Sequence, residues 1–194
     1  MTKYMRRAAL AAAVLIGCVS CSDVVRDSRS PVLVTVTNLT PAVLLSDVIR
    51  NVTTPAPCSP TSPCPTVLSD NATAEITASM KNVGISPTSN NQITINRYHV
   101  DFRRADGRGI EGVDVPRAFD GAVTASIPAN GSASVPFELV RHLSKSESPL
   151  VQLINNSNVI ATIAVVTFYG TDAVGNVVSA VGQVTVNFGN FGDQ

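Results

Sequence analysis

The chain has 194 residues, and its 14 basic side chains balance its 14 acidic ones. The first 17 residues contain three of the basic side chains and no acidic one, so the remainder has a net charge of 3 negative, which argues against nucleic-acid binding. Tryptophan is absent and small and β-branched residues dominate, a composition that favours β-sheet over helix.

The N-terminal segment is typical of an export signal. Lys3, Arg6 and Arg7 form a positive stretch, and an apolar run follows from Ala8 to Ile16. As a helix this run would be about 14 Å long, too short to cross a hydrocarbon core of roughly 30 Å. The sequence therefore predicts a removable signal peptide at residues 1–17.

The signal ends in Leu15-Ile-Gly-Cys18, which resembles the lipobox of bacterial lipoproteins. In that family the cysteine is acylated and becomes the first residue of the mature protein. The resemblance implies that Cys18 carries the lipid. The segment that follows is short, mixed in charge and without an apolar period, which predicts a flexible tether at residues 18–30. Val19 is not acidic, and in such lipoproteins an acidic residue at this place can cause retention at the inner membrane. We therefore expect an outer-membrane location, if the cell has an outer membrane.

Two alternatives stay open for this segment. Acylation of Cys21 would remove Cys18 with the signal and leave an even number of cysteines, although Cys18 would then occupy a position where the family has an aliphatic residue. The other alternative is an ordinary secretory signal cut elsewhere, or an uncleaved anchor.

A proline-rich loop is predicted at residues 53–65, which contain five prolines. Cys58 and Cys64 bracket its tip, and in an oxidising compartment we expect them to form a disulfide that removes on the order of 2 kcal/mol of unfolded-state entropy. A metal or redox site is the rival, but the spacing is not Cys-x-x-Cys and only His99 and His142 could add nitrogen ligands. No metal or cofactor is therefore predicted.

A β domain is predicted over residues 31–194, because short β-branched or alternating runs are separated by turn residues. The inward parity changes near Asn96 and Arg97, which predicts a β-bulge there, and Pro136 should mark an edge strand. One short helix is expected to start at Pro149 with Ser148 as its N-cap. The strands are expected at 32–37, 42–45, 74–80, 93–102, 122–127, 134–140, 159–169 and 178–188.

The last two strands are expected to form a hairpin around a turn at Gly170–Asn176. The first strand is apolar on both parities, as a central strand requires. The second alternates, so its two faces should differ. We expect Val178, Ala180, Gly182, Val184, Val186 and Phe188 to face inward, and Ser179, Gln183, Thr185 and Asn187 to face solvent.

Seven or eight short strands with one minor helix predict an all-β, antiparallel β-sandwich. The strand count, the Asp106-Gly107 turn and the closing hairpin resemble the immunoglobulin-like or fibronectin-III-like superfold. The Cys and Trp hallmark of immunoglobulin domains is missing, because Cys58 and Cys64 lie in one loop and the chain has no tryptophan. The resemblance implies no particular function, since this fold is widely reused.

No nucleophile elbow, phosphate loop, zinc-protease motif or dinucleotide fingerprint is present, so no enzymatic activity is predicted. The outward residues of one strand, Arg97, His99, Asp101 and Arg103, indicate either a solvated sheet surface or a patch for an anionic ligand. A lipid-anchored binding or structural module is predicted, which meets another cell-envelope protein through strand edges or loops.

The alternative function is a carbohydrate-binding or adhesion surface, which ordinarily exposes aromatic rings. Most aromatic residues of the domain fall on strands and are expected in the core, namely Tyr98, Phe102, Phe119, Phe168 and Tyr169. Phe191, beyond the last strand, is the exception.

Overall fold

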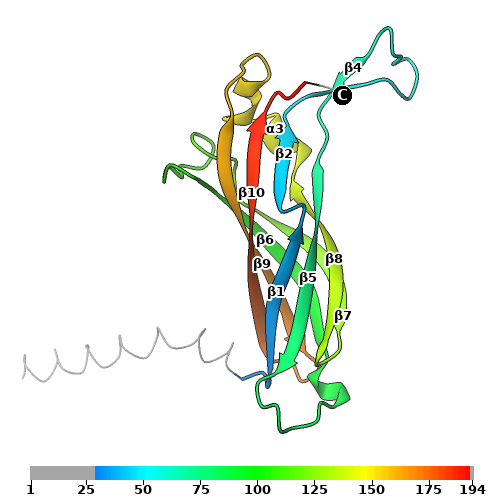
Figure 1. The fold of residues 1–194 in the computed structure, drawn as a ribbon, viewed down its shortest axis with the longest axis vertical. Coiled ribbons are helices and arrows are strands. Elements are labelled where there is room, and N and C mark those ends of the chain that lie inside the picture. The colour runs from blue at the N-terminus through cyan, green and yellow to red at the C-terminus, as the bar shows by residue number, and fades with distance from the viewer. Residues whose placement is uncertain (1–28, 193–194) are drawn as a thin grey trace, which may run out of the picture.

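Ten strands form nearly all of the regular structure in residues 29–192, the part of the chain that the computed structural model describes (Figure 1). A three-stranded sheet has the order β1-β5-β8, a five-stranded sheet has the order β2-β10-β9-β6-β7, and β3 and β4 form a separate ribbon. The strands are β1 Val32–Thr40, β2 Val43–Asp47, β3 Arg50–Val52, β4 Cys64–Thr66, β5 Asp70–Met80, β6 Ile93–Arg104, β7 Phe119–Ile127, β8 Gly131–Val140, β9 Ile160–Asp172 and β10 Val177–Gly189. The short helical turns are η1 Ser89–Asn91, α3 His142–Lys145 and η2 Leu150–Leu153.

The two ends of the elongated sandwich differ in what they contain (Figure 1). We call one end the base: residues 29–31 enter the domain there, beside the connections 81–92, 128–130 and 173–176. We call the opposite end the crown: it contains the β3–β4 ribbon, the 105–118 loop and the 141–159 segment with both α3 and η2. The long axis of the sandwich therefore separates the N-terminal entry from the longest connections.

One apolar core lies between the two sheets, and Tyr98 links them at its centre. Its ring contacts Phe137 of the facing sheet, with ring centroids 5.3 Å apart. Its hydroxyl accepts a hydrogen bond from the Glu138 backbone N–H, at 3.2 Å, next to the register shift between β5 and β8. Burial raises the pKa of Tyr98, so the hydroxyl stays neutral and satisfies a backbone donor inside the domain.

The expected closing hairpin is confirmed. β9 pairs with β10 on one side and with β6 on the other, so it is central in the five-stranded sheet. The predicted inward residues of β10 are buried apart from Gly182, which is half-buried. Of the residues expected to face solvent, Gln183 and Thr185 are exposed, whereas Ser179 and Asn187 are half-buried. The turn is shorter than expected, because β9 continues to Asp172. Gly170 lies within β9, where a Cβ atom would stand only 2.3 Å from the Thr94 carbonyl oxygen.

The expectation of a wholly antiparallel sandwich is wrong at one strand pair. β2 pairs with β10 in parallel, with Val43 opposite Thr185 and Leu45 opposite Asn187. The chain changes sheets at Pro41: it leaves β1 beside β5 and continues in the same direction beside β10, which also runs from base to crown (Figure 1). Parallel pairing follows from that shared direction.

Two further local predictions are confirmed, and the others are wrong or incomplete. The bulge near Asn96 and Arg97 is present in the pairing of β6 with both neighbours, and β8 with Pro136 is an edge strand. The helix prediction was wrong in its cap, because Pro149 itself occupies the N-cap of η2 and no side chain caps the turn. α3 was missed, and the predicted loop at 53–65 contains part of the β3–β4 ribbon.

Candidate functional site

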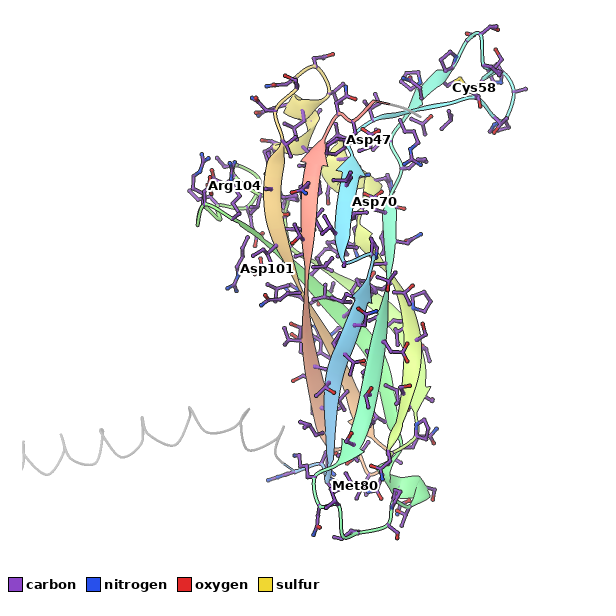
Figure 2. All side chains as sticks on the ribbon, viewed as in Figure 1. Asp47, Cys58, Asp70, Met80, Asp101 and Arg104 are labelled. Atoms are coloured by element: carbon purple, nitrogen blue, oxygen red, sulfur yellow. A yellow bond between two sulfur atoms is a disulfide. The ribbon has the colours of Figure 1, made fainter. Side chains whose placement is uncertain are left out.

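A cavity of about 360 Å³ opens at the crown, between the 105–118 loop and the 149–160 segment. We call it the crown pocket. Its volume lies within the range of sites that hold small ligands or side chains. Figure 2 shows Arg104, the last residue of β6, where the loop leaves the sandwich. The polar side chains of the lining are those of Arg104, Arg108, Asp114, Gln152, Asn156 and Asn158.

Asp106 fixes the two arginines of the crown pocket. Its Oδ2 atom accepts hydrogen bonds from Arg108 Nε at 3.0 Å and Nη2 at 2.8 Å, and pairs with Arg104 Nη2 at 3.1 Å. Hydrogen bonds from the side chain and backbone of Arg108 lower the pKa of Asp106 to about 2, so the carboxylate is charged at neutral pH. The Nε atom of Arg104 is buried and has no hydrogen-bond partner.

A second charged cluster at the crown is largely buried, with only the Asp70 side chain partly exposed. The Lys145 side chain is 1% exposed, and its Nζ lies 2.8 Å from Asp70 Oδ2 and donates to the Asp47 carbonyl oxygen, also at 2.8 Å. The fully buried Ser46 hydroxyl donates to the same Asp70 oxygen at 2.6 Å. This cluster joins α3 to β2 and β5 (Figure 2). Because Ser46 is inaccessible and bonds Asp70 rather than Lys145, the cluster has the form of a structural tie and not of a serine–lysine catalytic pair.

The polar face predicted on β6 is present, but its basic residues have acidic neighbours. Arg97 lies 3.0 Å and His99 lies 3.4 Å from Asp120 Oδ1, and Arg103 lies 3.2 Å from Asp101 Oδ2. These groups are partly or largely exposed. The arrangement therefore fits a solvated sheet surface better than a site for an anion, because exposed pairs of this kind neutralise one another at little gain in stability.

An exposed apolar patch lies on the outer face of the five-stranded sheet, toward the crown. Strand register places Val43, Thr185 and Ile163 in one row across the sheet, and Leu45, Asn187 and Ala161 in the next. We define the crown patch by its four exposed apolar residues, Val43 at 53%, Leu45 at 60%, Val159 at 50% and Ile163 at 39%. Val159 also lines the crown pocket, so the two surfaces are continuous.

The predicted disulfide between Cys58 and Cys64 is present, at the tip of the β3–β4 ribbon (Figure 2). Tyr98, Phe102, Phe119 and Phe168 are buried, as expected. Tyr169 was expected in the core but is only half-buried, and Phe191 is half-buried as well. The Arg97 guanidinium lies 4.1 Å above the Tyr169 ring, and the backbone N–H of Phe191 donates to Asp47 Oδ1. Among residues 29–192 the large exposed apolar side chains are all aliphatic, so no largely exposed aromatic ring supports the carbohydrate alternative.

Several sequence predictions concern residues that the structure does not describe. The signal peptide at 1–17, the acylation candidates Cys18 and Cys21, and the tether up to residue 28 lie outside the described part of the chain. Within residues 29–192, His, Cys, Asp and Glu side chains form no group of three or more that could hold a metal ion. No helix within that range has the length and apolar character to span a membrane.

No protein-family model and no curated protein matches this chain significantly. Among solved structures, a crystallographic structural-genomics target is 12% identical with a TM-score of 0.37, over 80% of this chain and 86% of the target. A second structure, solved in solution, belongs to a protein whose assignment to the late embryogenesis abundant class is provisional. It is 10% identical with a TM-score of 0.42, over 95% of this chain and 87% of the other. Similarity at this level supports no argument about function.

Proposed function

We propose that this chain is a lipid-anchored binding module of the cell envelope, without catalytic activity, that engages another envelope protein with its crown. The membrane attachment rests on the Leu15-to-Cys18 resemblance, with Cys18 as the acylated residue and the outer membrane as the expected location. One structural observation supports the mode of engagement: the chain enters at the base, while the crown patch and crown pocket lie toward the opposite end. A tether at the base directs the crown away from the membrane surface.

The crown patch supports a protein partner in particular. Aliphatic side chains that lie together in an exposed, ordered sheet gain free energy when a partner removes them from water, at about 25 cal/mol per Å². Arginine is one of the residue types that most often dominate the binding energy of protein interfaces. The crown provides both within one continuous surface, since Val159 belongs to the patch and lines the pocket that contains Arg104.

We also propose that the sandwich is of the immunoglobulin-like or fibronectin-III-like kind. Apart from β2 and the ribbon, seven strands remain in the described chain; the first, second and fifth form one sheet, and the third, fourth, sixth and seventh form the other. Immunoglobulin domains likewise combine their first, second and fifth strands against their third, sixth and seventh. Tyr98 lies on the third strand, where those domains have their buried tryptophan, which supports the proposal.

Site-specific photo-crosslinking in intact cells tests the proposed interaction. A photoreactive residue at Leu45 in the full chain should give a discrete crosslinked product with an envelope protein. Thr35 is the matched control, because it is exposed on the outer face of the three-stranded sheet. A product at Leu45 and none at Thr35 supports the proposal. Equal products at both positions, or none at either, would contradict it.

A further inference from the structure

The crown pocket has more hydrogen-bond donors than acceptors. Arg104 and Arg108 together provide ten N–H donors, as any two guanidinium groups do. Asp106 occupies Nε and Nη2 of Arg108 but only Nη2 of Arg104. The opposite wall adds the side-chain amides of Asn156 and Asn158, and Asn156 Oδ1 already accepts a hydrogen bond from the Asn158 backbone N–H. A pocket of this kind suits a ligand that is rich in acceptors.

Charge limits which acceptor suits it. The two arginines are balanced by Asp106 and by Asp114, whose Oδ1 lies 3.8 Å from Arg108 Nη1. Arg104 Nε is closed to solvent and one Nη2 hydrogen points to Asp106, so one added negative charge can be met by the Nη1 hydrogens and the second Nη2 hydrogen of Arg104. A second negative charge would add repulsion from Asp106 and Asp114, which already balance the two arginines. The cluster therefore favours a monoanion such as a carboxylate over a doubly charged phosphate.

Arg104 is prepared for such a ligand before binding. About four fifths of its side chain is buried, and the pair with Asp106 holds its guanidinium in one orientation. A guanidinium held in this way loses little freedom when it binds a carboxylate through two parallel hydrogen bonds. Val113 and Val159 offer apolar walls for the methylene groups that carry the carboxylate.

We propose that the crown pocket binds a carboxylate, and that an acidic side chain of the partner protein supplies it. This inference rests on the proposed function, because the partner is the one that the crown engages. The crown patch would bury apolar side chains of the partner while its neighbouring glutamate or aspartate enters the pocket.

The test uses the full chain and two short peptides that differ only by glutamate or glutamine at a central position between alanines and valines. Binding is followed by the resonance of the Arg104 Nε–H group in NMR titrations, with acetate and inorganic phosphate as further probes. We expect a saturable shift with the glutamate peptide and at least tenfold weaker binding of the glutamine peptide, acetate and phosphate.

Variants connect this binding to the pocket. Arg104→Gln should weaken binding of the glutamate peptide at least tenfold, as measured by isothermal titration calorimetry. Arg103→Gln should leave this affinity unchanged, because Arg103 is adjacent in sequence but pairs with Asp101 on the outer face of the sheet. Asn156→Asp is a second test that leaves both arginines intact. It keeps the oxygen that accepts from Asn158 and adds a negative charge to the opposite wall, so it should weaken binding as well.

The outcomes separate the two proposals. Equal binding of acetate and the glutamate peptide would overturn the partner side chain as the source of the carboxylate. No saturable binding, or equal losses in Arg103→Gln and Arg104→Gln, would overturn the pocket itself. If the Leu45 crosslink forms nevertheless, the proposed function stands without the pocket. If the peptide binds but the Leu45 crosslink is absent, the proposed function fails instead.

Discussion

The base of the sandwich is closed by backbone hydrogen bonds and by hydrogen bonds to the Asp172 carboxylate, whereas the crown is closed by ion pairs and a disulfide. At the base the Lys81 N–H donates to the Pro31 carbonyl and the Ala173 N–H donates to the Gln92 carbonyl. At the crown the Lys145 pair, the Asp106 cluster and the Cys58–Cys64 bond fix longer and less regular connections. Long loops provide few hydrogen bonds of their own, so they depend on such specific links to remain ordered.

This difference indicates where the domain can change without losing its fold. A turn that is held by backbone hydrogen bonds tolerates most side chains. The exception is a position whose backbone conformation requires glycine, as at Gly175 with φ of 90°. Buried ionic links do not, because removal of one partner leaves a charge without compensation. Loss of the buried Lys145 link at the crown should therefore cost more than loss of a link at the base.

The largest effect is expected at Lys145. Lys145→Met removes the cation from a buried pair and leaves Asp70 with only the Ser46 hydroxyl, so the free energy of unfolding should fall by about 3 kcal/mol. The double variant Lys145→Met with Asp70→Asn should recover part of that loss, since no buried charge remains. Chemical denaturation of both variants measures this. Equal losses in the two would show that the charge does not cause the instability.

Gly170→Ala should have the next largest effect. The added Cβ would meet the Thr94 carbonyl at 2.3 Å, and this contact is with backbone that cannot move aside without disturbing the pairing of β6 with β9. We expect a loss of about 2 to 3 kcal/mol in chemical denaturation. Gly109→Ala in the crown loop is the control, because nothing lies within 4 Å of its added Cβ and it should be neutral or slightly stabilising. A harmless Gly170→Ala would contradict the close approach.

The sequence predicted the parts of this fold that depend on local pattern. Alternation along a strand shows directly which side chains face the core. The predictions from Ala74, Ile76, Ala78 and Met80, and from the parity change after Ile95, were therefore correct. The parallel placement of β2 depends on the direction of β10, far away in sequence, and no local pattern contains it. Gly170 was wrongly predicted to begin the turn. A glycine in the sequence can indicate either a turn or a strand position where another backbone passes close by, and the sequence alone does not distinguish the two.

The candidate site was less predictable than the fold. The predicted disulfide followed from two cysteines in one loop, but the crown pocket combines residues from the 105–118 loop with others some 40 positions later. The crown patch depends on the parallel pairing of β2, so Val43 and Leu45 could not be assigned to the outer face. The alternation on β6 correctly showed that Arg97 and Arg103 lie outward beside Asp101, but not that Asp120 of the neighbouring strand pairs with Arg97.

At the base, Asp172→Asn should cost less than the Lys145 change and should alter the dependence of stability on pH. Burial raises the pKa of Asp172, but hydrogen bonds from Asn176, Ser30 and Val174 outweigh it and lower the pKa overall. A lowered folded pKa stabilises the domain above the unfolded value of about 3.9, and this contribution is lost as the pH falls through the folded pKa. We expect a loss of about 1 to 2 kcal/mol at pH 7. Denaturation at several pH values should show a smaller decline below pH 4 in the variant than in the unaltered chain, and parallel curves would contradict this account.

The smallest effect on stability, and the most informative for function, is expected on the outer face. Thr185 is exposed between Val43 and Ile163 in one row of the five-stranded sheet, so Thr185→Lys should change the free energy of unfolding by no more than about 0.5 kcal/mol. Thr35→Lys, on the outer face of the three-stranded sheet, is the matched control and should be equally mild. In cells the two should differ, because a lysine placed within the crown patch would have to be buried with its charge in the proposed interface. Thr185→Lys should therefore abolish the Leu45 crosslink while Thr35→Lys preserves it. If Thr185→Lys leaves the crosslink intact, the partner does not cover this row of the sheet, and the docking surface would have to be sought elsewhere on the crown.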